Sequence, residues 1–239
     1  MTDTIKNTIE NFDYGFVFTP ADFPVDQRKQ ATVNRILNNM VVSGQIRKIS
    51  KGRFYKPKMT EFGELPPNNY QLVKDLLEKN GKIIGYLTGY TAFNELGLTT
   101  QVPFALQIGV INEKKAIKRK FYRINFIKQQ NKITKENIYL LQLLDCLRFF
   151  KNIPDSMPDE TCRRLLLLLK ELKKEQREEI KKLSLKYTPQ ATALLGAMLE
   201  TLNLKENTTE MLNTLNPQTF YKLGISENIL FNQKKWNIK

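Results

Sequence analysis

The chain has 239 residues, of which 41% are hydrophobic and 26% are charged, and this balance is typical of a folded globular protein. Lysine and arginine number 38 against 24 aspartates and glutamates, so the formal net charge is +14, which favours a polyanionic partner. The absence of histidine excludes Ser-His-Asp and Cys-His catalysis and every histidine-ligated metal site.

Other functional classes also lack their motifs. The sequence contains no acidic D-x-D cluster, no GxGxxG and no GxxxxGK[ST] phosphate loop. We therefore predict a protein that is not an enzyme, with no catalytic residue, no metal ion and no other cofactor. The two cysteines, Cys146 and Cys162, are expected to be buried structural thiols. No apolar run approaches the roughly 20 residues that span a bilayer, and the first residues resemble no secretory signal, so we expect a cytoplasmic protein without a membrane partner.

The predicted elements begin with a short helix over residues 2–11, which carries Ile5 and Ile9 at helical spacing. Residues 14–18 are expected to be extended. Thr19 is a typical helix cap followed by Pro20 at the first helical position, and Pro24 should end that helix after about one turn.

A long helix is predicted next, from a cap at Asp26 to residue 42. Its apolar side chains recur at helical spacing and form one stripe, made of Val33, Ile36, Leu37, Met40 and Val41. The roughly opposite face is polar and basic and contains Arg28, Ala31, Arg35 and Asn38. Two short strands follow at residues 45–49 and 53–56, joined by a hairpin tip at residues 50–53.

This order of a helix, a short helix, a long helix and a basic hairpin predicts a winged helix-turn-helix over residues 1–58. Residues 27–58 contain nine basic side chains and no acidic one. The side chains expected to contact base edges are Gln27, Arg28, Thr32, Asn34 and Arg35. Lys51 and Arg53 at the hairpin tip are expected to contact the DNA backbone. A winged helix that binds only proteins is the alternative, although such domains often present an acidic or neutral face.

Residues 59–69 are predicted to be a linker, because they combine Gly63, Pro66 and Pro67 with paired asparagines. Residues 70–239 are predicted to form a second domain. Helices are expected at residues 70–79 and 90–96, and strands at 82–87, 104–111 and 121–127. Helices then dominate, with starts at Thr134, Pro158 and Pro189. The expected fold class is therefore α+β: a winged helix-turn-helix followed by a mixed α/β and then mostly helical domain.

A second basic run occupies residues 113–135, again with nine basic residues and a single acidic one. The side chains of this second candidate surface are Lys114, Lys115, Lys118, Arg119, Lys120 and Arg123. A solvated hairpin is one interpretation. An extension of the DNA-binding surface, an acidic protein partner and an RNA are the others.

Several segments resemble the AbiEi-type antitoxin family, and the resemblance extends along nearly the whole chain. They are residues 18–23, the hairpin 45–55, the stretch 89–103 with its Leu98-Thr99-Thr100-Gln101-Val102-Pro103, residues 134–138 leading into 141–145, and residues 221–225 with 236–238. The loop before the long helix, residues 24–26, is shorter than in that family.

The resemblance implies that the protein represses its own operon through the winged helix. Because operators commonly present repeated half-sites to winged helices, we predict that two copies bind the double-stranded promoter DNA. The resemblance also implies that the C-terminal domain counteracts a nucleotidyltransferase-like toxin, without a stable complex between them. The DNA contacts would fall on the residues named above, and no catalytic residue is implied. The alternative is a free-standing winged-helix regulator whose C-terminal domain senses a ligand or forms a dimer. A carboxylate- and magnesium-dependent nuclease is a third class, disfavoured by the thin scatter of acidic residues.

Overall fold

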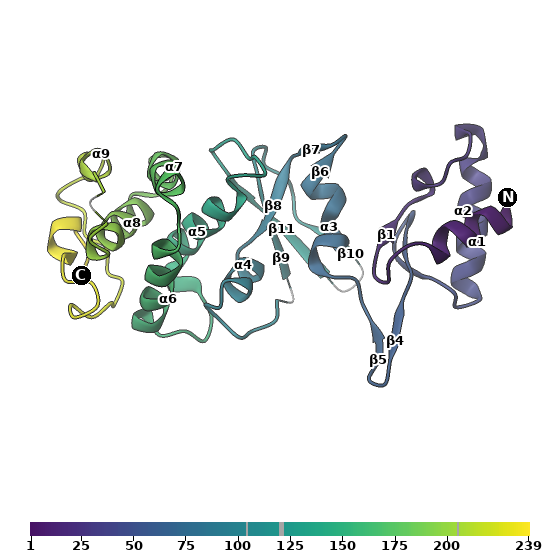
Figure 1. Ribbon diagram of the computed structural model, residues 1–239, viewed down its shortest axis with the longest axis horizontal. Helices are drawn as coiled ribbons and strands as arrows, with labels where there is room; N and C mark the ends of the chain where they lie inside the picture. The colour runs from purple at the N-terminus through teal and green to yellow at the C-terminus, as the bar shows by residue number, and fades with distance from the viewer. Residues whose placement is uncertain (104, 120–121, 205) are drawn as a thin grey trace. The chain divides into compact units, whose positions relative to one another are not determined.

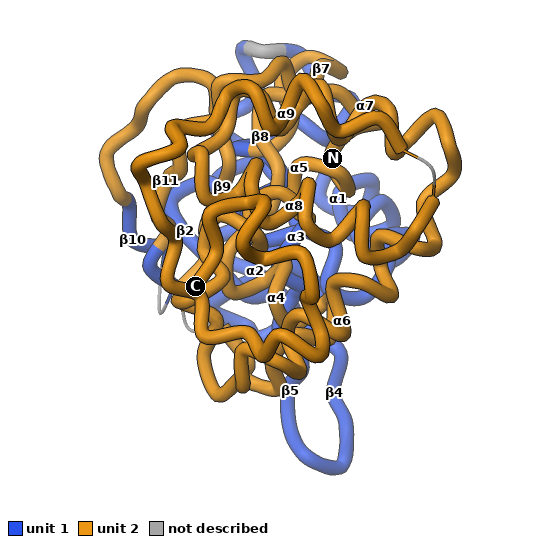
Figure 2. The backbone as a smooth tube through the Cα atoms, turned by 90° about the vertical axis from the view of Figure 1, so that its left-hand side faces the viewer, with its two compact units in different colours: residues 1–76, 117–123 blue, residues 77–116, 124–239 orange. Residues whose placement is uncertain are grey.

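The computed structural model describes residues 1–103, 105–119, 122–204 and 206–239, with the side chain of Gln27 also outside the described set. The chain divides into two compact units, shown in Figure 2. Unit 1 comprises Met1–Leu76 and Ile117–Arg123, and unit 2 comprises Leu77–Ala116 and Ile124–Lys239. The fold is α+β, as predicted (Figure 1).

Unit 1 alternates short helices and short strands. In chain order its elements are α1 (Thr2–Glu10), β1 (Val17–Phe18), the 3₁₀ turns η1 (Pro20–Asp22) and η2 (Gln27–Lys29), α2 (Gln30–Val42), β2 (Arg47–Ser50), β3 (Arg53–Tyr55), β4 (Lys58–Thr60), β5 (Gly63–Leu65), α3 (Asn69–Leu77, whose last residue falls in unit 2) and β10 (Ile117–Arg119). The antiparallel sheet has the strand order β1-β3-β2, with Phe18 opposite Phe54 and Lys48 also opposite Phe54.

The helical contribution to the core of unit 1 comes from residues whose spacing predicted it. Ile5 and Ile9 of α1 are buried, and so are Val33, Leu37 and Met40 of α2. Ile36 and Val41 of the predicted stripe are half-buried and pack against the same core. The helix predicted from Asp26 starts later than expected, because Asp26 accepts the Arg28 amide at 2.9 Å and supports the 3₁₀ turn η2, after which α2 begins at Gln30.

The predicted linker is an ordered hairpin. Residues 58–60 pair with residues 63–65 as β4 and β5, and Gly63 has a φ of 107°. This hairpin and most of α3 belong to unit 1, so the division between the compact units falls after Leu76 rather than at residues 59–69. Phe62 at its tip is 99% exposed.

Unit 2 combines a sheet with helices. Its elements are β6 (Glu78–Lys79), β7 (Lys82–Ile83), β8 (Gly85–Thr88), α4 (Tyr90–Glu95), β9 (Ala105–Val110), β11 (Tyr122–Lys128, whose first two residues fall in unit 1), α5 (Ile138–Arg148), η3 (Phe150–Asn152), α6 (Pro158–Lys170), α7 (Lys174–Ser184), α8 (Pro189–Thr201), α9 (Thr209–Asn213) and η4 (Gln233–Trp236). The sheet order is β10-β11-β9-β8. The helix predicted to start at Thr134 starts at Ile138, because Asn137 accepts the Thr134 amide at 2.9 Å and closes a turn before it.

Helix α8 is the centre of the helical part of unit 2. Nine consecutive residues, 191–199, are buried, and the helix packs against α5, α6, α7, α9 and η4. At Gly196 the backbone of α8 lies directly against the fully buried ring of Trp236. A Cβ added at this glycine would lie 2.1 Å from Cη2 of that ring. The small-residue face of α8 therefore accommodates the C-terminal tryptophan.

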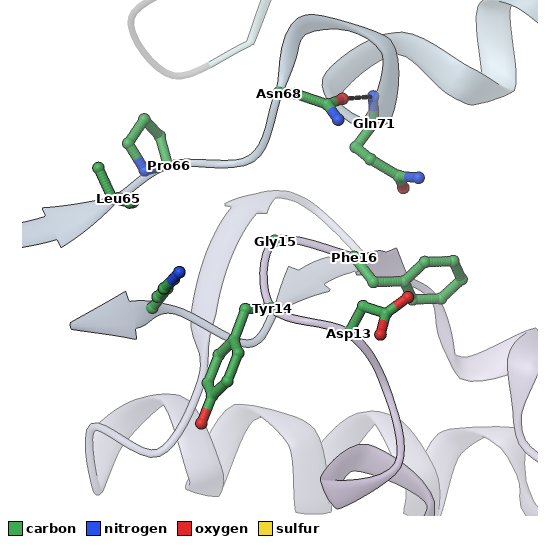
Figure 3. A pocket seen from close by; sticks show the side chains of 9 residues that line it. Asp13, Tyr14, Gly15, Phe16, Leu65, Pro66, Asn68 and Gln71 are labelled. Carbon is green, nitrogen blue, oxygen red and sulfur yellow. Dashed lines mark hydrogen bonds between the residues drawn. The ribbon is translucent and has the colours of Figure 1, made fainter. Parts of the chain in front are cut away.

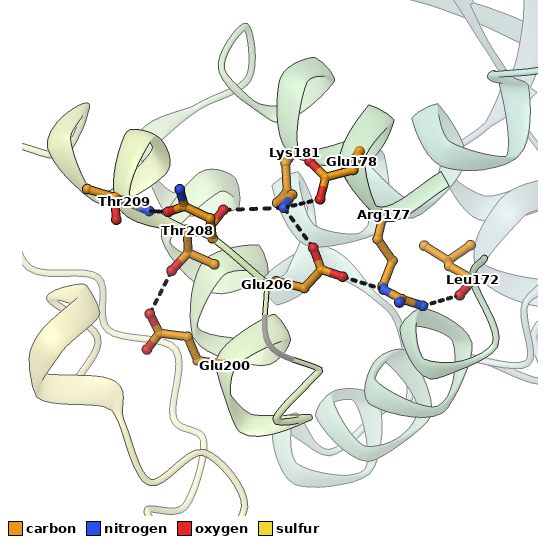
Figure 4. A network of polar contacts seen from close by, with 9 residues as sticks. Leu172, Arg177, Glu178, Lys181, Glu200, Glu206, Thr208 and Thr209 are labelled. Atoms are coloured by element: carbon orange, nitrogen blue, oxygen red, sulfur yellow. Dashed lines mark hydrogen bonds and ion pairs between the residues drawn. The ribbon is translucent and has the colours of Figure 1, made fainter. Parts of the chain in front are cut away.

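A cluster of ionised side chains ties the segment after α8 to α7 (Figure 4). Glu206 accepts hydrogen bonds from Arg177 Nε and from Lys181 Nζ, each at 2.7 Å, and its side chain is only 5% exposed. Lys181 also donates to Glu178 at 2.8 Å. Burial raises the pKa of Glu206, but the hydrogen bonds from Arg177 and Lys181 outweigh it and leave that pKa below its ordinary value.

We expect this cluster to make the free energy of unfolding depend on pH in the acidic range. Because the folded-state pKa of Glu206 is lowered, its contribution is present above the ordinary glutamate pKa of about 4.3 and is lost as the pH falls through the folded value. Glu206→Gln should lower the free energy of unfolding by about 1.5–3 kcal/mol at neutral pH. The gap between wild type and variant should close toward pH ~3. Urea unfolding of both proteins across this pH range measures the difference in their free energies of unfolding. A difference that stays constant with pH would contradict the role assigned to Glu206.

Candidate nucleic-acid interface

The buried stripe of α2 directs the opposite face of the helix to solvent. Arg28 and Arg35 are exposed, as is Ala31 between them. Thr32 and Asn34 are half-buried on the flanks. Gln27 lies in η2, and its side chain is outside the described residues.

A polar contact that the sequence did not reveal connects α2 to the hairpin. Asn38 Nδ2 donates to the Asn34 carbonyl at 2.7 Å, and Lys48 Nζ donates to Asn38 Oδ1 at 2.8 Å. The ammonium group of Lys48 also lies 5.8 Å from the centroid of the Phe54 ring. Asn38 is thus engaged in holding β2 against the helix.

The two hairpin cations differ in their surroundings. Lys51 is exposed at the tip, next to Gly52, whose φ of 71° allows the tight turn. Arg53 is half-buried, and its Nη2 lies 2.5 Å from Oδ2 of Asp75 in α3. Burial lowers the pKa of the Arg53 guanidinium, and Asp75 opposes that shift. The side chain of Arg53 is therefore directed toward α3 of unit 1. The sequence had instead predicted that this side chain would lie at the hairpin tip and contact the DNA backbone.

Asp75 also binds the second basic run. Arg119 Nη1 and Nη2 each donate to its carboxylate at 2.7 Å, and Nη1 donates to the Leu72 carbonyl at 2.9 Å. One carboxylate in α3 therefore pairs with both Arg53 and Arg119. No signal near Asp75 in the sequence indicates this role, because both partners are distant along the chain.

The rest of the second run is divided between the units. Lys118 and Arg123 are exposed in unit 1, and Lys114 and Lys115 are exposed in unit 2. Lys114 Nζ lies 5.5 Å from the centroid of the Phe126 ring. Lys120 lies outside the described residues. The six predicted side chains thus do not all share one unit.

The nine basic residues of 27–58 fall into an engaged group and an exposed group. Arg47 pairs with Glu64 at 2.7 Å, and Lys56 Nζ donates to the Glu10 carbonyl at 2.8 Å. The exposed group is Arg28, Lys29, Arg35, Lys51 and Lys58, with Lys48 exposed but bonded to Asn38. Within the described ranges, no ion pair includes any member of the exposed group. Lys29 and Lys58 were not selected from the sequence.

A cavity of about 380 Å³ also lies in unit 1, between the loop at residues 13–16, β5 and the start of α3 (Figure 3). Gln71 Oε1 accepts the Val17 amide at 3.2 Å, and Asn68 Oδ1 accepts the Gln71 amide at 2.8 Å. Asp13 and Lys58 bring opposite charges to its lining. This cavity therefore attracts anions less than the exposed face of α2.

The described residues include no cluster of three metal-ligating side chains. Cys146 and Cys162 are buried and unpaired, as predicted. Burial raises the pKa of Cys162 to about 12 and raises that of Cys146 well above the ordinary thiol value, so neither thiol is a ready nucleophile. Across the residues described, no helix is both long enough and apolar enough to cross a membrane.

Comparison with models of protein families identifies the family of the chain. The model of DUF6088, a family of unknown function, matches residues 4–180, which is well over half of the sequence. The chain belongs to the DUF6088 family. The matched region includes α2, the β2–β3 hairpin and Asp75. Comparison of this DUF6088 chain with curated proteins finds no match.

Among solved structures, the DUF6088 chain is similar to the crystal structure of the RV2827C protein from Mycobacterium tuberculosis. The TM-score is 0.57 and the identity 10%, with 93% of this chain and 84% of that chain covered. At this identity the similarity shows the fold alone.

Proposed function

We propose that unit 1 is a winged helix-turn-helix that binds double-stranded DNA. The order α1, β1, η1 and η2, α2, β2, β3 and the sheet order β1-β3-β2 support this fold, with α2 as the recognition helix and the β2–β3 hairpin as the wing. The observation that carries the function is the pair of exposed arginines, Arg28 in η2 and Arg35 opposite the buried stripe of α2.

The two arginines come from consecutive elements at the start of the recognition helix. Arg28 lies in the 3₁₀ turn η2, and Arg35 lies in α2, seven positions later. Arginine can donate two hydrogen bonds to one guanine edge, so the pair would contact two separate bases. Gln27, Thr32 and Asn34 flank them and would complete the base contacts, while Lys51 would contact the DNA backbone.

We further propose that the protein is a cytoplasmic autorepressor and antitoxin. The support is the resemblance of residues 89–103, 134–138 with 141–145, and 221–225 with 236–238 to the AbiEi-type family. Two copies would bind the promoter, because operators commonly present paired half-sites to helix-turn-helix proteins. The functional partner would be a nucleotidyltransferase-like toxin, and no catalytic residue is assigned to this chain.

The test is a gel-shift titration of the full chain against the DNA upstream of its own gene and against a scrambled duplex, at two salt concentrations. We expect tighter binding to the upstream duplex and a steep loss of affinity for both duplexes at the higher salt. Equal binding to the two duplexes would contradict sequence recognition. If the upstream duplex is preferred, growth of cells co-expressing a candidate toxin tests the antitoxin role separately.

A further inference from the structure

A second pocket, of about 260 Å³, lies in unit 2 where three segments end. Lys128 is the last residue of β11, Arg148 is the last residue of α5, and Lys186 lies in the connection from α7 to α8. All three line the pocket, together with Gln129, Tyr187 and Thr188 among others.

The charge of this pocket is one-sided. Its lining contains three cationic side chains and no carboxylate. Lys128, Arg148 and Lys186 take part in none of the ion pairs that the structure shows among its described residues. Lys181 in the neighbouring helix α7 is the contrast, because Glu178 and Glu206 neutralise it. A concave site that is lined by positive charges alone concentrates the electrostatic field and attracts anions.

Arg148 is held in place rather than extended into solvent. Its guanidinium carbon lies 5.0 Å from the centroid of the Phe149 ring, and its Nη1 lies 3.4 Å from the Lys128 carbonyl oxygen. These contacts leave the arginine half-buried with donors to spare. A planar guanidinium fixed in this way suits two-point recognition of a phosphate group.

A buried hydrogen-bond network supports the pocket from behind. Gln129 Nε2 donates to the Tyr187 hydroxyl at 2.7 Å and to the Tyr86 hydroxyl at 2.9 Å. Both tyrosines donate to the buried carboxyl group of Asp145, at 2.7 Å from Tyr86 and 3.1 Å from Tyr187. Thr88 donates to the same carboxyl group at 2.6 Å. The carboxyl oxygens are thus occupied inside the unit, and Gln129 and Tyr187 are positioned without any ligand.

We propose that this pocket binds the phosphate group of a small molecule, with Arg148 and Lys186 as its principal contacts and Lys128 and Thr188 at its edge. A volume near 260 Å³ suits inorganic phosphate or the phosphate end of a mononucleotide. The shared chemistry is a phosphate dianion. The positive end of the α8 dipole adds to the field, since Thr188 is the N-cap of that helix. This binding site is in unit 2 and does not depend on DNA binding by unit 1.

The experiment is isothermal titration calorimetry of the full chain, without DNA, against inorganic phosphate, adenosine monophosphate and adenosine. We expect the two phosphate-bearing ligands to bind at one site per chain and adenosine to give no binding heat. Equal affinity for phosphate and the mononucleotide would assign the site to phosphate alone. Tighter binding of the mononucleotide would assign it to a nucleotide. Binding of adenosine at equal strength would overturn the proposal.

Charge-matched variants test the location. Arg148→Gln with Lys186→Gln should weaken phosphate binding about ten-fold or more, because both principal contacts are lost. Lys170→Gln with Lys182→Gln removes the same charge from exposed positions outside the pocket and should bind like wild type. Thermal unfolding of both variants controls for folding. Equal loss in the two variants would show an effect of net charge alone, and either that result or no loss in the pocket variant would overturn the assignment.

Discussion

The double variant Arg28→Ala with Arg35→Ala is expected to lose its preference for the upstream duplex while remaining folded. Both side chains are exposed, Arg28 in η2 and Arg35 on the face of α2 opposite its buried stripe, so their removal leaves the core intact. Each arginine that contacts a base is worth about 1–3 kcal/mol of discrimination. Because each arginine would contact a separate base, their losses should add to about 2–6 kcal/mol.

Gel-shift titrations of wild type and the double variant against both duplexes measure this loss, and urea unfolding checks that the midpoint is unchanged. The variant should bind the upstream duplex no better than the scrambled one. Operator binding at wild-type strength would show that α2 is not the recognition helix. A large shift of the unfolding midpoint would show that the two arginines stabilise unit 1.

Lys51→Gln is the matched control for that experiment. Lys51 is an exposed hairpin cation and is assigned to the backbone, so its loss should weaken binding to both duplexes equally. The slope of log affinity against log salt should fall by about one for the lost phosphate contact. A selective effect of Lys51→Gln on the upstream duplex would place the hairpin at a base edge instead.

The sequence predicted the parts of unit 1 that local patterns determine. The apolar spacing in α2 identified its core face, and Gly52 has the positive φ that the tight turn of the predicted hairpin tip requires. The role of Arg53 could not be predicted, because its partner Asp75 lies in a helix assigned to another domain. A basic residue on a hairpin has the same local pattern whether it contacts a phosphate or a distant carboxylate.

Two hairpins were missed because local sequence patterns did not distinguish them from other structures. Asn80-Gly81 is the strongest short signal for a tight hairpin, and it joins β6 to β7 with φ values of 51° and 72°. The helical pattern of residues 70–79 obscured it, and α3 ends at Leu77. At residues 59–69 the glycine and prolines were interpreted as a linker, although β4 and β5 pair there. Composition alone does not distinguish a flexible linker from a short hairpin.

The cationic pocket in unit 2 bears on the choice between the two regulatory hypotheses. An antitoxin that acts without a ligand needs no such pocket, whereas a ligand-sensing regulator does. A phosphate-bearing ligand that binds at Arg148 and also changes operator affinity would favour the free-standing regulator. The same ligand without any effect on operator affinity would leave the autorepressor-antitoxin proposal unchanged.

The contact between Gly196 and Trp236 is expected to have the largest effect on stability. Trp236 is fully buried, and its Nε1 donates to Glu200 Oε2 at 3.1 Å. Glu200 also accepts from Lys235 Nζ at 2.7 Å, so one carboxylate holds the C-terminal turn on α8. Trp236→Ala should lower the free energy of unfolding by about 3–5 kcal/mol, because it leaves a cavity of ring size and removes one hydrogen bond to Glu200.

Gly196→Ala tests the same contact from the other side. A Cβ at this position would lie 2.1–2.6 Å from three atoms of the Trp236 ring, which is far inside van der Waals contact. Alanine is intrinsically better than glycine in a helix by about 1 kcal/mol, so a variant without this clash would be more stable. We instead expect a net loss of about 1–3 kcal/mol, because the ring must move within a close-packed core.

Chemical denaturation of wild type, Gly196→Ala, Trp236→Leu and the double variant measures the coupling between the two positions directly. The clash should disappear when the ring is absent, so Gly196→Ala should be neutral or stabilising in the Trp236→Leu background. The same destabilisation in both backgrounds would place the strain elsewhere in α8 and would separate Gly196 from the docking of the C-terminal segment.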